Sequence, residues 1–429
     1  MPSPSVPAAP AVRMGADPAP VLQIDLISSV LGQVPLDGLM AVARRDNPKR
    51  AILVVSRLLG KHLDVSPTTA IAAGAALGQL VARALGSGRP AEAVDLLTKA
   101  LLGGPAPALL PAAGDGPAAV VLAYAETATA IGHLVRRALG PGPLLHTTRA
   151  LWGPGALLSF AEPHSHATEH LVFHDDPAIL DVPVPVVLVD DELTTGRTVM
   201  NTIDAIQRIR PRDRYVLATY LDWRPAERRE ELRAFALGHG VQIDVVALAS
   251  GTTSVIDPGP RNVPTRPGVV AAGATGRPFS AVTVPIGVRP TARRGWTELE
   301  QEIVEESALR AAVQLQRHRS GLRTLVLGTE ELMYVPLLLA AHLEGDVQVR
   351  STTRSPILLS EEPGYPVVDG VAYRATDGTA GLRYLYNLGL DEADDVFLCC
   401  EDRAAYGRSG LLTALTERHD RVHVVELVR

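Results

Sequence analysis

At 429 residues the chain is longer than a typical single domain, so two domains are expected. Its hydrophobic fraction of 46% supports full cores, and its formal net charge of −6 argues against a general nucleic-acid-binding protein, because such domains normally carry a basic surplus. Cys399 and Cys400 are the only cysteines and are adjacent, which excludes a disulfide framework and predicts a reducing, cytoplasmic location. No stretch of the sequence approaches a membrane span, so no membrane partner is expected.

The first twenty residues are rich in Pro and Ala and lack a continuous apolar stretch, so residues 1–20 are predicted to form a disordered tail. Residues 21–280 then alternate β-type runs with amphipathic segments. The predicted strands lie at 51–55, 118–123, 144–151, 186–191, 215–221 and 241–248, and the predicted helices at 69–85, 91–101, 130–139, 199–209 and 225–237. This alternation indicates an α/β fold with a parallel sheet covered on both faces. Ligands of such sheets bind beyond the carboxyl ends of the strands, where Glu126, Arg149 and Asp190 are expected.

The most informative segment is VVLVDDELTTGRT, residues 186–198. A β-branched run ends in two carboxylates, and a short Thr/Gly turn then opens an amphipathic helix. Asp190 and Asp191 could accept hydrogen bonds from vicinal ribose hydroxyls, and could bind Mg²⁺ through water or through those hydroxyls. The turn presents unpaired amides and about half a positive charge at a helix N-terminus, which suits a phosphate; it comprises Thr194, Thr195, Gly196, Arg197 and Thr198. The alternative is an ordinary buried strand followed by a capped helix.

This segment resembles the phosphoribosyl-diphosphate (PRPP) motif of type I phosphoribosyltransferases, in which an apolar strand precedes an acidic pair, four variable residues, Gly, any residue, and Thr or Ser. The resemblance implies a Rossmann-like sheet and PRPP as substrate, with Asp190 and Asp191 also among the catalytic residues. The turn at 123–129 lies where those enzymes place their pyrophosphate loop. Its side chains are therefore expected to hold diphosphate through Mg²⁺, although they could instead only cap a helix; they are Glu126, Thr127 and Thr129.

Two further basic groups are candidates for binding diphosphate. Arg149 could clamp it, because guanidinium donors match phosphate oxygens bidentately, and a surface ion pair is the alternative. Lys61 is one of only three lysines in the chain. With Arg57 and His62 it could add positive charge over the site, and solvated loop charges are the alternative.

The segment HSHATEHLVFHDD, residues 164–176, is the most ambiguous. It precedes the motif strand, where type I enzymes carry a loop that closes over the reaction and excludes water. Under that interpretation His166 or His170 is the acid that protonates a leaving or attacking group, and the lid includes His164, Ser165 and Thr168. The spacing of His164, His166 and His170 could also ligate a transition metal, and plain loop polarity is the third possibility.

Residues 281–295 are predicted to be a linker, and residues 296–429 a second α/β domain. In that domain the sequence matches itself, because EDRAAYGRS at 401–409 aligns without a gap with DDELTTGRT at 190–198, and STTRSPI parallels HTTRALW. We therefore predict a diverged copy of the first domain, with a candidate site formed by Glu330, Arg354, Ser355, Glu401 and Asp402. Tyr406 and Ala405 replace Thr195 and Thr194, so the ligand is expected to differ from PRPP. The alternative is the strand-turn-helix rhythm that any two α/β domains share.

The PRPP motif, the LGKH and HSHATEH segments, and the tetrad Thr353, Arg354, Ser355, Pro356 together resemble the orotate-phosphoribosyltransferase-like proteins with a C-terminal TRSP domain. That family is encoded with tellurite-resistance (ter) stress gene clusters in bacteria, and the resemblance covers residues 21–429. It implies a transferase that moves ribose 5-phosphate from PRPP to a nitrogenous base, in nucleotide metabolism leading to a nucleoside-like metabolite. The alternatives are a catalytically inactive PRPP-sensing regulator and a phosphoribosyl hydrolase or lyase. Expected ligands are Mg²⁺, PRPP and a nucleobase-like acceptor, and candidate partners are a second copy in a homodimer and other biosynthetic proteins of ter clusters.

Overall fold

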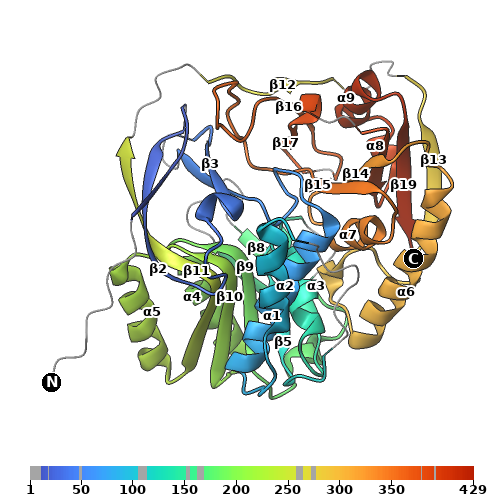
Figure 1. The fold of residues 1–429 in the computed structure, drawn as a ribbon. Helices are drawn as coiled ribbons and strands as arrows, with labels where there is room; N and C mark the ends of the chain where they lie inside the picture. The colour runs from blue at the N-terminus through green and yellow to red at the C-terminus, as the bar shows by residue number, and fades with distance from the viewer. Residues whose placement is uncertain are drawn as a thin grey trace.

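The structure is a computed structural model that describes residues 11–17, 19–47, 51–104, 114–150, 155–161, 169–257, 264–271, 277–377, 379–390 and 393–429. Two α/β halves lie side by side, the first coloured blue to yellow-green and the second orange to red (Figure 1). Within these residues, no helix combines the length and apolar character that crossing a bilayer requires.

A seven-stranded sheet forms the first half, in the order β1-β2-β11-β10-β9-β5-β6. The strands from β11 to β6 are parallel, and β2 and β1 add antiparallel strands at one edge. The bounds are β1 Val12–Met14, β2 Val21–Ser29, β5 Val120–Ala123, β6 Leu144–His146, β9 Val186–Leu193, β10 Arg214–Asp222 and β11 Gln242–Asp257. The central strands are nearly continuous apolar runs, as both-face burial requires. The predicted parallel sheet is confirmed, whereas the predicted tail over residues 1–20 is wrong at Val12–Met14, which pair with β2.

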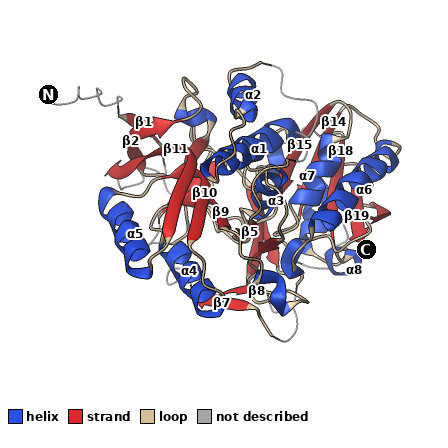
Figure 2. Cartoon of the chain, turned by 90° about the horizontal axis from the view of Figure 1, so that it is seen from below, coloured by secondary structure: helices blue, strands red, loops and turns tan. Residues whose placement is uncertain are grey.

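Helices cover both faces of this sheet, α1 and α3 on one and α4 and α5 on the other (Figure 2). The bounds are α1 Pro67–Ala84, α2 Glu92–Leu101, α3 Thr129–Arg137, α4 Arg197–Ile209 and α5 Ala226–His239. Helix α1 packs closely on α3, because a Cβ added at Gly74 would lie 2.5 Å from the Cβ of Leu134. The strand predicted at 51–55 exists, but it pairs in a separate hairpin rather than in the parallel sheet: β3 Met40–Arg44 and β4 Ile52–Ser56.

The second half contains a five-stranded parallel sheet in the order β13-β19-β18-β14-β15. Its strands are β13 Ser280–Pro285, β14 Arg323–Gly328, β15 Asp346–Ser351, β18 Asp395–Cys400 and β19 Val422–Val428, and its helices are α6 Glu298–Gln316, α7 Tyr334–Ala341, α8 Arg403–Tyr406 and α9 Gly410–Arg418. Short antiparallel pairs flank the two large sheets: β7 Leu158–Ala161 with β8 Glu169–Val172, and β16 Gly370–Arg374 with β17 Leu382–Tyr386, beside which lies β12 Gly268–Val269. The linker predicted at 281–295 is therefore wrong in its first part, because β13 pairs along its whole length with β19.

The two large sheets share one strand order, since β10-β9-β5-β6 in the first corresponds to β19-β18-β14-β15 in the second. Backbone hydrogen bonds repeat as well: the amide of Thr147 donates to the carbonyl of Ala123 at 2.9 Å, and that of Thr352 to Gly328 at 3.1 Å. The hydroxyls of Thr147 and Thr352 each accept one amide of the adjoining loop, at 2.8 and 3.0 Å. Counting along these strands makes Glu126 equivalent to Glu331 and Arg149 equivalent to Arg354.

The strand register corrects the ungapped sequence match by one residue. Leu122 on β5 pairs with Leu188 on β9, and its equivalent, Leu327, pairs with Leu398 on β18. Counting onward makes Glu401 equivalent to Asp191 and Asp402 equivalent to Glu192, rather than to Asp190 and Asp191. The match was misleading because a sequence alignment carries no information on register, and one residue exchanges the faces of a strand. The common origin of the two halves stays a prediction.

The two halves share one hydrophobic core, to which Leu134 of α3 and Leu338 of α7 both contribute. Helices α1 and α3 pack against α7 in the middle of the molecule. There the ring of His133 stacks on that of Tyr334 with centroids 4.2 Å apart, and the edge of β6 pairs with Trp296. The equivalent helices α3 and α7 therefore meet at the boundary between the halves.

Candidate active site

The two carboxylates of the PRPP-like motif lie near the carboxyl end of β9, in the middle of the first sheet. The strand continues to Leu193, so the prediction that it ends at the acidic pair is wrong. Successive residues of a strand alternate between faces, which puts Asp190 on the side of α4 and Asp191 on the side of α1 and α3. Both are half-buried. The pair therefore straddles the strand.

The turn of residues 194–198 connects β9 with α4. Gly196 caps the helix with a φ of 73°, in the left-handed region that glycine adopts without strain. The hydroxyl of Thr195 accepts the amide of Arg197 at 3.4 Å, and Thr194 is exposed. Because the first amides of a helix have no partner inside it, this turn has the donor arrangement that binds phosphate.

The loop between β5 and α3, predicted to be the pyrophosphate loop, contacts the acidic pair. The hydroxyl of Thr127 donates to Asp191 Oδ1 at 2.7 Å. Thr129 is buried, and its hydroxyl donates instead to the carbonyl of Glu126 at 3.1 Å. Of the three residues of this loop predicted to hold diphosphate, Thr127 is thus the one that reaches the acidic pair.

Glu126 is bonded across the boundary to the second half. Its Oε1 lies 2.7 Å from Nε of Arg354 and its Oε2 lies 3.4 Å from Nζ of Lys61. Lys61 is 1% exposed and also donates to the carbonyl of Glu330 at 2.7 Å. A buried ammonium and a buried carboxylate require partners, and Lys61 and Glu126 bind each other and the second half. Their predicted contact with diphosphate stays a prediction.

Burial and charge oppose each other at this boundary. Burial lowers the pKa of the Lys61 ammonium, and the attraction of Glu126 and Glu330 limits that shift. Burial, together with Glu126, raises the pKa of Glu330, although Arg383 and Arg354 oppose the change. Burial alone would lower the pKa of Arg354, but Glu126 and Glu330 raise it instead. Arg354 therefore stays charged and holds a carboxylate from each half.

His170, predicted as a catalytic acid in the segment of residues 164–176, lies on β8 and is 2% exposed, so at this position the segment is a buried strand rather than an irregular loop. Its Nδ1 is 3.0 Å from the hydroxyl of Thr147, its Nε2 is 3.4 Å from a guanidinium nitrogen of Arg149, and its ring stacks on Phe160. The structure thus brings His170 together with the predicted diphosphate clamp. Four other predicted residues lie outside the described residues: His164, Ser165, His166 and Thr168. Among the residues that are described, no group of three or more His, Cys, Asp or Glu side chains is placed to hold a metal ion.

A cavity of about 270 Å³ lies at the carboxyl edge of the second sheet. Four of the five residues predicted for a second site line it: Glu330, Arg354, Glu401 and Asp402. Ser355 is not among the lining residues, and its carbonyl accepts the hydroxyl of Tyr386 at 2.7 Å. The lining also includes Arg293, which is bonded to Glu331 at 2.5 Å and to Glu401. Most of the predicted second site is therefore one cavity.

Sequence reasoning missed an ion-pair network beside the turn of residues 194–198. Asp222 at the end of β10 is 1% exposed and binds both Arg224, at 2.9 Å, and Arg229, at 2.6 Å. The side chain of Arg224 packs beside Gly196, whose added Cβ would meet it at 3.6 Å. The signal was available, because DWRP directly follows a predicted strand and ligands of parallel sheets bind at that edge.

Comparison with known families agrees with this architecture. Residues 39–252 match the family model described as phosphoribosyl transferase, and residues 290–415 match that of the TRSP domain found C-terminal to it. The chain carries a phosphoribosyl transferase domain followed by a TRSP domain. The first large sheet and the turn of residues 194–198 belong to the phosphoribosyl transferase domain, and the cavity belongs largely to the TRSP domain.

Solved structures similar to the chain include three adenine phosphoribosyltransferases. The enzyme from Trypanosoma brucei, in complex with AMP, pyrophosphate and ribose-5-phosphate, is 15% identical over 30% of this chain and 56% of its own, with a TM-score of 0.23. The enzymes from Giardia lamblia, complexed with 9-deazaadenine, and from Leishmania donovani are each 16% identical with TM-scores of 0.22, over 31% and 32% of this chain and 70% and 57% of their own. The chain thus spans little more than half the length of the Trypanosoma enzyme. No curated protein matches the chain, and the domain assignment rests on the two family models.

Proposed function

We propose that the protein is a phosphoribosyltransferase, which moves ribose 5-phosphate from PRPP to a nitrogenous base and releases diphosphate. The supporting observation is the hydrogen bond between Thr127 and Asp191, which joins the loop after β5 to the acidic pair. The turn of residues 194–198 begins three residues after Asp191 in the chain. PRPP carries a phosphate, a ribose and a diphosphate. The helix N-terminus suits the phosphate, the acidic pair suits the ribose, and the hydroxyl-bearing loop suits the diphosphate.

In this proposal each group has one task. The amides at the start of α4 bind the 5-phosphate, and Asp190 and Asp191 accept hydrogen bonds from the ribose hydroxyls. Thr127 and Arg149 hold the diphosphate, since a guanidinium can donate to two of its oxygens. The bond from C1 to diphosphate breaks with its electron pair on the departing oxygen, and the base nitrogen forms the new bond to C1 from the opposite face. The protein contributes positioning and charge stabilisation.

His170 is a positioning residue in this scheme rather than the acid. Its ring is buried, and its two nitrogens lie at the hydroxyl of Thr147 and the guanidinium of Arg149, so it fixes the direction of that guanidinium. Mg²⁺ fits the same edge, because Asp190 and Asp191 offer the half-buried carboxylate oxygens that this hard cation prefers. When bound, the ion would neutralise charge on the diphosphate.

The finer parts of the proposal come from the sequence motifs. We assign the protein to the orotate-like subtype, encoded with ter clusters and acting in synthesis of a nucleoside-like metabolite, with a homodimer and other ter-cluster proteins as partners. We place it in the cytoplasm, since Cys399 and Cys400 are both buried free thiols.

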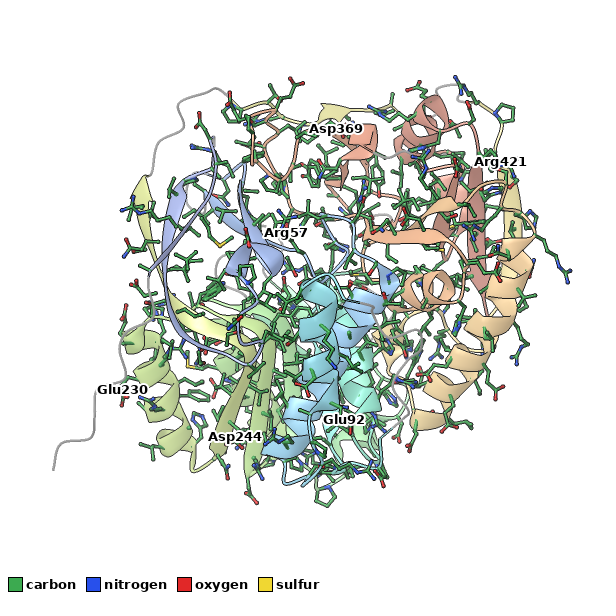
Figure 3. The ribbon with its side chains drawn as sticks, viewed as in Figure 1. Arg57, Glu92, Glu230, Asp244, Asp369 and Arg421 are labelled. Carbon is green, nitrogen blue, oxygen red and sulfur yellow. The ribbon has the colours of Figure 1, made fainter. Side chains whose placement is uncertain are left out.

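The test is turnover of PRPP to diphosphate in the presence of Mg²⁺, with no base and with orotate, adenine, guanine, hypoxanthine and uracil in turn. The proposal expects diphosphate release that depends on one added base and that disappears in the Asp190→Asn plus Asp191→Asn variant. The matched control is Glu230→Gln, which removes a charge on the outer side of α5 (Figure 3). Release without any base would indicate a hydrolase, and PRPP binding without turnover on any base would indicate a regulator.

A further inference from the structure

The cavity of the TRSP domain lies at the position that corresponds to the PRPP site of the first half. Glu331, Arg354 and Glu401 line it, and by strand register they are the equivalents of Glu126, Arg149 and Asp191. We propose that this cavity is a second binding site, and that its ligand is a nucleoside, a ribosyl compound without a phosphate. The inference rests on the proposed function in one respect, the assignment of ribose to the acidic pair of the first half.

The charge of the cavity wall disfavours a phosphate. Five carboxylates and two arginines line the cavity. Both arginines are already neutralised, Arg293 by Glu331 and Glu401, and Arg354 by Glu126, Glu330 and Asp377. A phosphate would therefore meet a wall with surplus negative charge and no uncommitted guanidinium among its lining residues. A neutral ligand rich in hydroxyl and amino donors meets acceptors instead.

The backbone of the cavity also lacks the phosphate-binding turn. Where the first half has an open turn capped by Gly196, the second has the one-turn helix α8, whose first amides are engaged: the carboxylate of Asp402 accepts the amide of Ala405 at 3.0 Å. Tyr406 at the end of α8 is 7% exposed and lines the cavity. An aromatic ring there offers an apolar surface to a sugar or a base, whereas hydroxyls and amides would suit phosphate.

The volume of the cavity is compatible with a nucleoside. At about 270 Å³ the cavity lies just below the range of roughly 300 to 1,000 Å³ that is usual for small-molecule sites. The two wall residues that tie it to the first half, Arg354 through Glu126 and Glu331 through the hydroxyl of Thr148 at 2.9 Å, hold its shape without any ligand. With its wall held in this way, a cavity of this volume favours a compact ligand over an extended nucleotide.

The experiment is isothermal titration calorimetry of the full chain carrying Asp190→Asn and Asp191→Asn, so that the first site does not bind ribose. The probes are adenosine, guanosine, cytidine and uridine, each beside its 5′-monophosphate. We expect one of the nucleosides to bind with one molecule per chain, and its monophosphate to bind at least tenfold more weakly. Adding Tyr406→Ala or Asp402→Asn should weaken the nucleoside at least tenfold, and asparagine preserves the helix cap of α8.

The matched control is Asp346→Asn, which removes an exposed carboxylate from the amino end of β15 in the same sheet, and it should leave nucleoside affinity unchanged. The proposal is overturned if no nucleoside binds, if a monophosphate binds as tightly as its nucleoside, or if affinity is insensitive to both cavity substitutions. PRPP binding by the wild-type chain is measured separately, so a failure of the second site is distinguishable from a failure of the proposed function.

Discussion

The large sheets of the two halves have the same strand order, but the side chains at their carboxyl edges differ in charge. At the carboxyl edge of the first sheet, Asp190 and Asp191 are half-buried beside a turn that opens α4 at Gly196 without a side-chain hydrogen bond from the capping residue. At the same edge of the second sheet, Arg293 and Arg354 join carboxylates from several loops into ion pairs around a cavity. One edge thus keeps donors for an anionic ligand, and the other has committed its cations to the protein itself. A shared topology therefore fixes where a ligand binds, whereas the charge of the loops decides which ligand fits.

The largest predicted effect on stability is a difference between substitutions at two equivalent positions, Arg354 and Arg149. Arg354→Ala leaves the buried carboxylates of Glu126 and Glu330 without one of their cations, and it should lower the free energy of unfolding by about 3 kcal/mol. Arg149→Ala should lower it by less than about 1 kcal/mol, because it loses a 3.4 Å contact with the ring of His170, but should reduce kcat/KM for PRPP roughly tenfold or more. Denaturant unfolding measures the free energies of unfolding, and initial rates measure kcat/KM. Equal losses of stability in the two variants would contradict the comparison.

A second prediction concerns the stability of the folded protein at low pH. Burial alone would raise the pKa of Asp395. Hydrogen bonds from Arg421, Ser320, His423 and Gly321 have the larger combined effect and lower that pKa to about 2. The folded state therefore favours the carboxylate, and this stabilisation is present above the unfolded value of about 4 and lost as the pH falls through about 2. The equivalent residue, directly before β9, is Pro185, which carries no charge.

Asp395→Asn should consequently reduce the free energy of unfolding by roughly 2 kcal/mol at pH 7, and the difference from wild type should close between about pH 4 and pH 2. Arg421, at the outer edge of the second half in Figure 3, supplies one of the hydrogen bonds, at 2.8 Å. The measurement is urea unfolding across that pH range. A difference that stays constant with pH would show that the carboxylate contributes through packing rather than charge.

The smallest effect is expected at Gly196, the glycine of the turn of residues 194–198. Gly196 has a φ of 73°, so Gly196→Ala should cost about 1 kcal/mol of stability and weaken PRPP binding by distorting the turn. Gly196→Asn should cost less, because asparagine tolerates the left-handed region. The aligned residue of the second half, Gly407, has a φ of −60° and does not require glycine for its backbone. Thermal unfolding ranks the variants, and an alanine variant as stable as wild type would refute the strain argument.

Local features were predictable from the sequence, whereas contacts between distant segments were not. The strand, turn and helix around residues 186–209 follow from apolar periodicity and one glycine, and the parallel sheet follows from alternation. The salt bridge between Glu126 and Arg354 joins segments far apart in the chain, and no local pattern encodes it. His170 appeared to belong to a polar loop because its burial depends on the partner strand β7.

Strand register was the other feature that the sequence could not predict. Residues 190–198 and 401–409 align without a gap, yet the second segment forms an additional helical turn, α8, before the longer helix α9. The match therefore pointed to the sheet edge where the cavity lies, but it assigned Glu401 and Asp402 one position away from their equivalents. Four of the five predicted residues line that cavity because the repeated motif lies at the same sheet edge in both halves.

The central claim is that the acidic pair and the turn after it bind PRPP in the first half. Calorimetric titration of the full chain with PRPP and Mg²⁺ tests it most directly. The account predicts one PRPP per chain, and for Asp190→Asn plus Asp191→Asn a loss of about 1.5 to 3 kcal/mol for each charge-assisted interaction, or roughly a hundredfold or more in Kd. A variant whose Kd stays within twofold of wild type, with the fold intact by circular dichroism, would contradict it.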